Sequence, residues 1–262
     1  MQQLIDLQLP VYTYGILMLV AFLAGTWLFS ANCRATGIKR PDLVDFMLII
    51  SLAGLAGARI MYIALFPQQF SSFRDLIALH EGGLVFHGGL FAAAAGLFVY
   101  FLKKSLPWRA LFDAVTPSLA LGHAIGRFGC LINGCCYGAR TDLISIYHLS
   151  GDPPGCYRHP TQAYEGGFLL LLAVFTAMLL RRRPGVVSAR PGVLTGLYVF
   201  VYSIWRFLLE FIRDDDRGGF FTPILLSPGQ LASIFLMTLA GLMVIYCYKY
   251  PADTGDKADE QN

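Results

Sequence analysis

Three arginines that lie inside otherwise apolar runs are the residues best suited to chemistry in this sequence. Arg59, Arg127 and Arg206 each fall within such a run rather than at its edge. An arginine within a membrane span costs about 2.5–3.5 kcal/mol on insertion scales, so three together need about 8–10 kcal/mol of compensation. A planar guanidinium group binds phosphate through paired hydrogen bonds. The phosphate of an anionic lipid is therefore a suitable partner for them.

Acidic side chains that could neutralise these arginines are few. Arg206, Glu210 and Arg213 occupy positions i, i+4 and i+7, which share one face of a helix. Pairing of Glu210 with one of these arginines is the structural alternative to phosphate binding. Glu210 and Glu165 are the only acidic residues expected at this depth, so positive charge exceeds negative charge there.

His87 is the candidate for proton transfer. It lies in the segment Glu81-Gly-Gly-Leu-Val-Phe-His-Gly-Gly-Leu90. A single histidine at the start of a helix is more often a structural hydrogen-bonding residue. Here Gly88 and Gly89 would let backbone or ligand approach the imidazole closely. An imidazole titrates near neutral pH, so His87 could act as a general base.

Four of the six cysteines fall between residues 130 and 156, on the side expected to face outward: Cys130, Cys135, Cys136 and Cys156. Three interpretations remain open for them. A disulfide could join Cys135 or Cys136 to Cys156 if the compartment is oxidising. A metal site with His148 or His159 has no matching ligand spacing. One of the cysteines could also accept a lipid group transiently.

The composition places these residues in a membrane protein. Of 262 residues, 56% are hydrophobic and 14% are charged, and the mean hydropathy is +0.57. The charged fraction is well below the roughly 25% of soluble domains, which excludes a cytosolic globular enzyme. A net charge of +3 is too small for a nucleic-acid-binding protein.

Seven apolar runs are long enough to cross a bilayer. The predicted fold is an all-α integral membrane protein of one domain, residues 1–250, with a small extracytoplasmic cap within 133–162 and a disordered cytoplasmic tail at 251–262. The expected transmembrane helices lie at 12–31, 43–65, 84–102, 111–132, 163–180, 193–212 and 222–247.

The basic residues predict the orientation. Twelve lysines and arginines fall in one set of loops and the tail, against five in the other set. The positive-inside rule therefore predicts an outward N-terminus and a cytoplasmic C-terminus. In that orientation the polar residues of all seven helices meet near the outer headgroup layer: Tyr14, Arg59, His87, Arg127, Gln162, Glu165, Arg206 and Gln230.

The order of motifs resembles that of the bacterial prolipoprotein diacylglyceryl transferase family along nearly the whole chain. The matching pieces are Tyr14-Gly15, Gly57-Ala-Arg59, Phe86-His-Gly-Gly-Leu90, Gly126-Arg-Phe-Gly129 followed by Asn133-Gly134 and Tyr137-Gly138, Arg158-His-Pro-Thr-Gln-Ala-Tyr-Glu165, Arg206 with Glu210 and Arg213, and Ser227-Pro-Gly-Gln230.

The resemblance implies a bacterial inner-membrane enzyme with its active site toward the periplasm. Its donor would be phosphatidylglycerol, its acceptor the lipobox cysteine of a prolipoprotein signal peptide, and its second product glycerol phosphate, with no metal or other cofactor. The implied catalytic residues are His87, Arg127, Arg206 and Tyr14. The expected substrate-binding residues are Arg59, Gly88, Gly89, Asn133, Gly138, Gln162, Glu210, Arg213 and Gln230.

Two residues depart from the pattern of that family. Cys130 stands where the family typically has asparagine, and Cys135 where it typically has an acidic residue. These changes leave two alternatives open. The chain could transfer a group derived from phosphatidylglycerol to an acceptor other than a lipoprotein, or it could bind phospholipid without catalysis.

Overall fold

The computed structural model is all-helical in the part of the chain that it describes: residues 10–70, 72, 75–76, 83–141, 152–153, 155–182, 189–214 and 226–250. No strand occurs there, only two isolated bridges, Gly138 with Arg213 and Arg140 with Arg158. The helices are α1 (Pro10–Thr36), α2 (Leu43–Leu65), η2 (Pro67–Gln69), α4 (Phe86–Lys103), α5 (Trp108–Ile132), α6 (Thr161–Arg182), α8 (Val193–Leu209), η4 (Glu210–Ile212) and α9 (Pro228–Lys249).

Each predicted apolar run coincides with an α-helix. Among the described helices, five are long and apolar enough to cross a membrane: α1, α2, α6, α8 and α9. The apolar part of α4 is shorter, at His87–Lys103. The last run was predicted from residue 222, but α9 begins at Pro228, because Ser227 and Gln230 form a capping box at its N-terminus. Residues 222–225 and the predicted tail at 251–262 lie outside the described residues.

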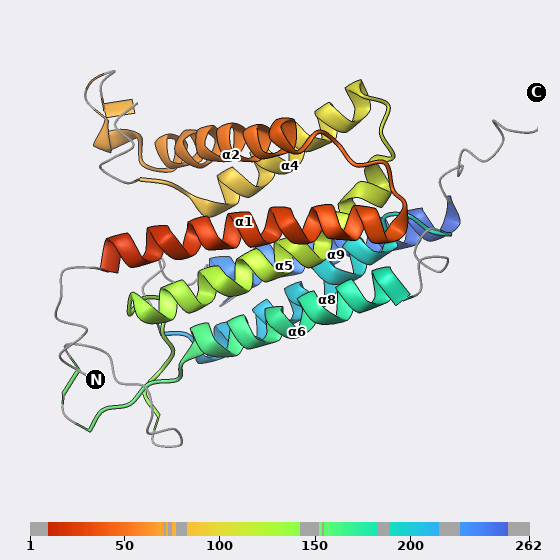
Figure 1. Cartoon of the computed structure of the whole chain (residues 1–262). Coiled ribbons are helices and arrows are strands. Elements are labelled where there is room, and N and C mark those ends of the chain that lie inside the picture. Colours follow the sequence, from red (N-terminus) through yellow and green to blue (C-terminus); the bar gives the residue numbers. More distant parts are fainter. Residues whose placement is uncertain are drawn as a thin grey trace, which may run out of the picture. The chain divides into compact units, whose positions relative to one another are not determined.

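The helices fall into two compact units. The first contains α1, α5 from Phe112 onward, α6, α8 and α9, several of which run side by side in Figure 1. Its core joins Ala120 and Ala124 of α5 to Leu169 and Ala173 of α6 and to Tyr198 of α8. Small residues on α5 let the neighbouring helices pack closely.

A buried aspartate positions the helix that carries Arg206. Asp113 of α5 is fully buried and accepts hydrogen bonds from the backbone N–H groups of Gly192 (2.7 Å) and Thr195 (2.8 Å). The Thr195 hydroxyl donates a third, at 2.7 Å. These bonds satisfy backbone donors that the first turn of α8 leaves unpaired, and a carboxylate is favoured at that end of the helix dipole.

The second unit, residues 37–111, is built on a crossing of α2 and α4. The two helices meet at glycines. A Cβ atom added to Gly57 would lie 2.2 Å from the Cβ of Ala92, and one added to Gly88 would lie 2.4 Å from the carbonyl oxygen of Gly57. Only residues without a side chain allow backbones this close. Close packing therefore accounts for Gly88 and for its neighbour Gly89.

Candidate active site

The first unit gathers cationic side chains around the buried carboxylate of Glu165. This residue lies in the first turn of α6 and is completely buried. Arg127 Nη2 is 2.9 Å from Glu165 Oε1, and the Tyr202 hydroxyl donates to the same oxygen at 2.7 Å. His123 Nε2 lies 3.8 Å from Oε1, and Arg213 Nη1 lies 3.9 Å from Oε2. One carboxylate thus connects three helices and the segment after η4.

A second carboxylate pairs with Arg206. Arg206 Nη2 is 2.6 Å from Glu210 Oε2, one helical turn away, and the Ser227 hydroxyl donates to Glu210 Oε1 at 2.7 Å. The predicted pairing within this i, i+4 motif is therefore present. Arg206 also interacts electrostatically with Glu165.

We call Arg127, Arg206 and Arg213 the arginine cluster. Among the residues that the structure describes, its three positive charges face two carboxylates, Glu165 and Glu210, so positive charges exceed negative ones there by one. All three arginine side chains are largely buried, with exposed fractions of 15%, 11% and 3%. A buried excess charge is costly unless an anion balances it.

Two hydrogen-bond donors of the arginine cluster remain available for a ligand. Arg127 Nε and Arg206 Nη1 are buried and have no hydrogen-bond partner among the residues that the structure describes. A buried polar group left without a partner costs about 1–3 kcal/mol. Orphaned donors of this kind indicate an acceptor supplied from outside the chain, and a phosphate oxygen suits guanidinium nitrogens.

The turn after α5 is held against the N-terminus of α6. Gln162 Nε2 donates to the Cys135 carbonyl oxygen, and the Thr161 hydroxyl donates to that of Cys136 at 2.8 Å. Gly138 is buried beside this turn, where an added Cβ would lie 2.6 Å from the Ile212 carbonyl oxygen. Gln162 and Gly138, both predicted to bind substrate, therefore let this turn pack closely against α6 and η4.

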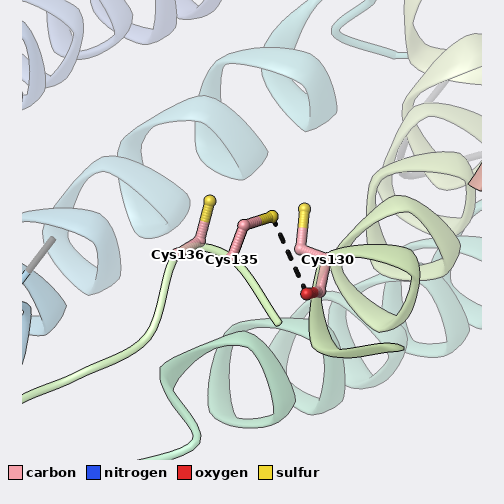
Figure 2. Close-up of side chains that lie close together, drawn as sticks. All are labelled: Cys130, Cys135 and Cys136. Carbon is pink, nitrogen blue, oxygen red and sulfur yellow. Dashed lines mark hydrogen bonds between the residues drawn. The ribbon is translucent and has the colours of Figure 1, made fainter. Parts of the chain in front are cut away.

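The cysteines of this turn form a cluster of their own. The Sγ atoms of Cys130, Cys135 and Cys136 lie within 4.8 Å of one another, and Figure 2 shows the Cys135 sulfur turned toward Cys130. All six cysteines of the chain are free thiols, so neither pairing with Cys156 considered from the sequence is formed.

The Cys136 thiol lies in a strongly polar environment. Hydrogen bonds with the Cys130 and Cys135 thiols lower its pKa below the ordinary value for cysteine. The charges of Arg213 and Arg127 act in the same direction on this pKa, because they stabilise the thiolate.

The cap is held by Arg158. Arg158 Nε donates to Asp152 at 2.6 Å, and Nη1 donates to Asp214 at 2.9 Å. Its guanidinium group also lies 4.7 Å from the centre of the Tyr137 ring. The described parts of the predicted cap, within 133–162, are therefore tied to the segment that follows η4.

Several predicted site residues have other partners or lie elsewhere. Arg59, in the second unit, donates to the carbonyl oxygens of Leu76, Gly83 and Asp75. Gln230 takes part in the capping box of α9. Asn133 is exposed where α5 ends.

The structure describes less of His87 and Tyr14, the two residues expected at the reacting centre. His87 is exposed in the first turn of α4 and belongs to the second unit. Tyr14 lies in α1, in the first unit, and its side chain is outside the described part.

Of two further residues at the site, Tyr202 was missed from the sequence, and His123 was expected mainly to pack one turn before Arg127. His123 and Tyr202 both contact Glu165, and their rings pack edge to face at 5.3 Å. A spacing signal was present, because each lies four residues before an arginine of the cluster, Arg127 or Arg206.

Comparison with known proteins identifies the family. The family model described as "Prolipoprotein diacylglyceryl transferase" matches residues 2–246. The chain belongs to this family. It is 31% identical over 255 residues to "Phosphatidylglycerol--prolipoprotein diacylglyceryl transferase 2" of Clostridium perfringens (strain 13 / Type A), covering 95% of this chain and 96% of that protein.

Further relatives carry the same name without the number. The protein of Synechococcus elongatus is 32% identical over 252 residues, with 92% of this chain and 84% of that protein covered. The protein of Clostridium tetani is 28% identical over 234 residues, with coverage of 88% and 91%. The match to the diacylglyceryl transferase family thus includes Glu165, the whole arginine cluster and the three clustered cysteines.

Proposed function

We propose that this chain transfers the diacylglyceryl group of phosphatidylglycerol to the lipobox cysteine thiol of prolipoproteins and releases glycerol phosphate. Its family and the names of its relatives support a transferase of this type. The observation that carries the proposal is the buried excess charge of the arginine cluster, with free donors on Arg127 and Arg206.

The donor phosphate is proposed to bind at the arginine cluster. Phosphatidylglycerol carries one negative charge, which equals the excess positive charge of the cluster. Arg127 Nε and Arg206 Nη1 would donate to phosphate oxygens, while the other nitrogens of these side chains keep their carboxylate partners. Glu165 and Glu210 then serve to orient the guanidinium groups rather than to contact the donor.

The reaction is a nucleophilic displacement at carbon. The acceptor thiol gives its proton to His87, and the thiolate attacks the glycerol carbon that is esterified to phosphate. The carbon–oxygen bond breaks, and its electron pair leaves with glycerol phosphate. Negative charge grows on the departing phosphate, so Arg127 and Arg206 stabilise the transition state more than the donor. Tyr14 would orient the phosphate or the base through its hydroxyl.

In the membrane we propose seven crossings, with the N-terminus outside and the C-terminus in the cytoplasm. The five long apolar helices and the unequal distribution of basic residues support this arrangement. The arginine cluster would then lie toward the periplasmic side of the bacterial inner membrane, at the level of the outer headgroups.

A direct test uses purified protein, phosphatidylglycerol and a synthetic lipobox peptide. Mass spectrometry should find the peptide heavier by one diacylglyceryl unit, together with one equivalent of glycerol phosphate. The control peptide carries serine in place of the lipobox cysteine and should stay unmodified. Neither product forming under these conditions would contradict the proposed activity.

The second candidate function is transfer of the lipid-derived group to an acceptor other than a lipoprotein. The reason to consider it is that two cysteines depart from the family pattern. Cys130 and Cys135 occupy the segment that carries Arg127. Release of glycerol phosphate alongside an unchanged peptide would support this candidate. Phosphatidylglycerol binding without release of glycerol phosphate would instead support a non-catalytic lipid-binding protein.

A further inference from the structure

Three thiols converge where the backbone must adopt an unusual conformation to bring them together. Neighbouring side chains on an extended chain point to opposite sides, so adjacent cysteines do not ordinarily share a site. Cys136 instead has a φ of 64°, and Gly134 has a φ of 67°. A left-handed conformation at a residue with a side chain is strained, and such strain concentrates at functional sites.

Hydrogen bonds to main-chain carbonyl oxygens hold the turn, and one of them comes from the Cys135 thiol, which donates to the Cys130 carbonyl oxygen at 3.7 Å. The carbonyl oxygens of Cys135 and Cys136 accept from Gln162 and Thr161 of α6, and the Cys135 N–H donates to the Cys130 carbonyl oxygen at 3.1 Å. These bonds position the backbone that carries the three sulfur atoms, which lie within 4.8 Å of one another. This matches the way that metal-binding side chains are supported in proteins.

We propose that Cys130, Cys135 and Cys136 bind one zinc ion through three thiolates and leave its fourth position open for the acceptor thiol. Tetrahedral zinc with bonds of about 2.3 Å to sulfur separates its ligands by about 3.8 Å. The observed sulfur atoms lie within 4.8 Å of one another, so small rotations of the side chains close the site. Figure 2 shows all three on one side of the turn.

The number of ligands distinguishes a catalytic site from a structural one. Within the described residues, no carboxylate or imidazole joins the three thiols at this spacing. Structural zinc sites have four protein ligands, whereas catalytic sites have three and keep one position for water or substrate. Soft thiolate ligands also favour zinc over magnesium or calcium. Arg127 and Arg213 lie near enough to interact with the Cys136 thiol and would offset the negative charge of the thiolates.

The open position has a chemical use, which rests on the proposed function. A thiol that coordinates zinc loses its proton, so the acceptor cysteine would be held as a thiolate beside the donor phosphate. The proton passes to the base, sulfur forms a bond to the glycerol carbon, and the electron pair of the broken bond leaves with the phosphate. The product is a neutral thioether, which binds zinc less strongly than a thiolate and can leave.

Metal binding is tested on reduced, full-length protein kept free of oxygen. After loading with Zn²⁺ and removal of the excess, elemental analysis should give one zinc per chain. Cys130→Ser, Cys135→Ser and Cys136→Ser should each weaken binding by roughly tenfold or more, because each removes one of three ligands. Cys156→Ser is the matched control, since this partly buried thiol lies outside the cluster, and it should bind as the unsubstituted protein does. Absence of stoichiometric zinc, or equal binding by all four variants, would overturn the site.

Cobalt replaces zinc to test the open position. The visible absorption of Co²⁺ reports tetrahedral coordination by sulfur, and it can be measured on the unsubstituted protein even if a serine variant does not fold. A lipobox peptide added without lipid donor should change this spectrum, while the peptide with serine in place of cysteine should not. An unchanged spectrum would overturn the role of the fourth position.

The same samples separate this proposal from the proposed function. A cobalt spectrum that responds to the peptide, with no lipidation once phosphatidylglycerol is supplied, would uphold the site and contradict the transferase activity. Equal lipidation by zinc-loaded and zinc-free protein would uphold the transferase activity and overturn the role of zinc in it.

Discussion

At the scale of single residues, the arginine cluster depends on Glu165. This carboxylate is completely buried and is shared by Arg127, Arg213 and His123, with the Tyr202 hydroxyl as a further donor. A buried carboxylate shared in this way fixes the positions of side chains that would otherwise repel one another. Glu165 therefore positions the surrounding side chains as well as stabilising the folded protein.

We predict that Glu165→Gln is strongly destabilising. The amide keeps a similar shape but removes the negative charge, which raises the excess of the site from one positive charge to two. Breaking a buried ion pair by removing one partner costs about 3–5 kcal/mol. The measurement is the unfolding temperature in detergent, compared with Tyr202→Phe, which removes only one hydrogen bond to the same oxygen. A smaller loss for Glu165→Gln than for Tyr202→Phe would contradict the central role of this charge.

His87 and Arg127 should respond differently to substitution. His87→Gln removes the proposed base and should lower turnover by about 10²–10⁴-fold, while the affinity for phosphatidylglycerol stays unchanged. Arg127→Ala should weaken both, because it removes a proposed phosphate ligand. Donor affinity is measured by equilibrium binding and turnover by release of glycerol phosphate. Turnover at the unsubstituted rate in His87→Gln would remove this residue from the mechanism.

At the scale of elements, the crossing of α2 and α4 provides a matched pair of substitutions. A Cβ at Gly57 would lie 2.2 Å from Ala92 Cβ and 2.5 Å from the Gly88 carbonyl oxygen, whereas one at Gly167 would have no neighbour within 4 Å. We predict that Gly57→Ala destabilises the protein by about 1–3 kcal/mol through overpacking. Gly167→Ala should be neutral or slightly stabilising, because alanine favours the helix. Equal unfolding temperatures for the two variants would show that the helices separate at little cost.

The helices were predictable from the sequence because each apolar run is long and is bounded by charged or helix-breaking residues. The depth of Arg127 and Arg206 near the ends of α5 and α8 followed from the same runs. The partners of these arginines did not follow, since they depend on which faces of α5, α6 and α8 meet. The sequence suggested Glu210 as a partner from its helical spacing, but the sharing of Glu165 arises only from tertiary packing.

Arg59 shows a second limit of prediction from sequence. Its place in an apolar run indicated a lipid phosphate as a partner, and the structure adds backbone carbonyl oxygens of the chain between α2 and α4 as partners. Every residue has a backbone carbonyl group, so the residue types in the sequence do not indicate which carbonyl groups will lie close to Arg59. Gly88 and Gly89 illustrate the same point. Their close contact with α2 depends on how α2 and α4 cross, which the sequence alone does not show.

At the scale of the whole molecule, the number of membrane crossings depends on α4 and α5. In the described part of the chain, these two α-helices do not combine the length and the apolar character of the other five. The polar residues of α5 explain its lower hydropathy. Asp113, Thr116 and Ser118 are buried within the protein and have exposed fractions of 0%, 2% and 7%. A helix enclosed by its neighbours can carry polar groups through a bilayer, because they do not face lipid.

We therefore predict that α4 and α5 both cross the membrane and that the turn between them faces the cytoplasm, where Lys103, Lys104 and Arg109 would follow the positive-inside rule. Alkaline phosphatase needs disulfides and is active only outside the cytoplasm. Fusions that end after Gln69 and after Arg140 should be active, and a fusion after Lys104 should be inactive. Green fluorescent protein at the same three positions is the control and should give the opposite pattern. An active phosphatase after Lys104 would contradict this prediction, because it would leave five crossings and place Lys103, Lys104 and Arg109 outside the cytoplasm, against the positive-inside rule.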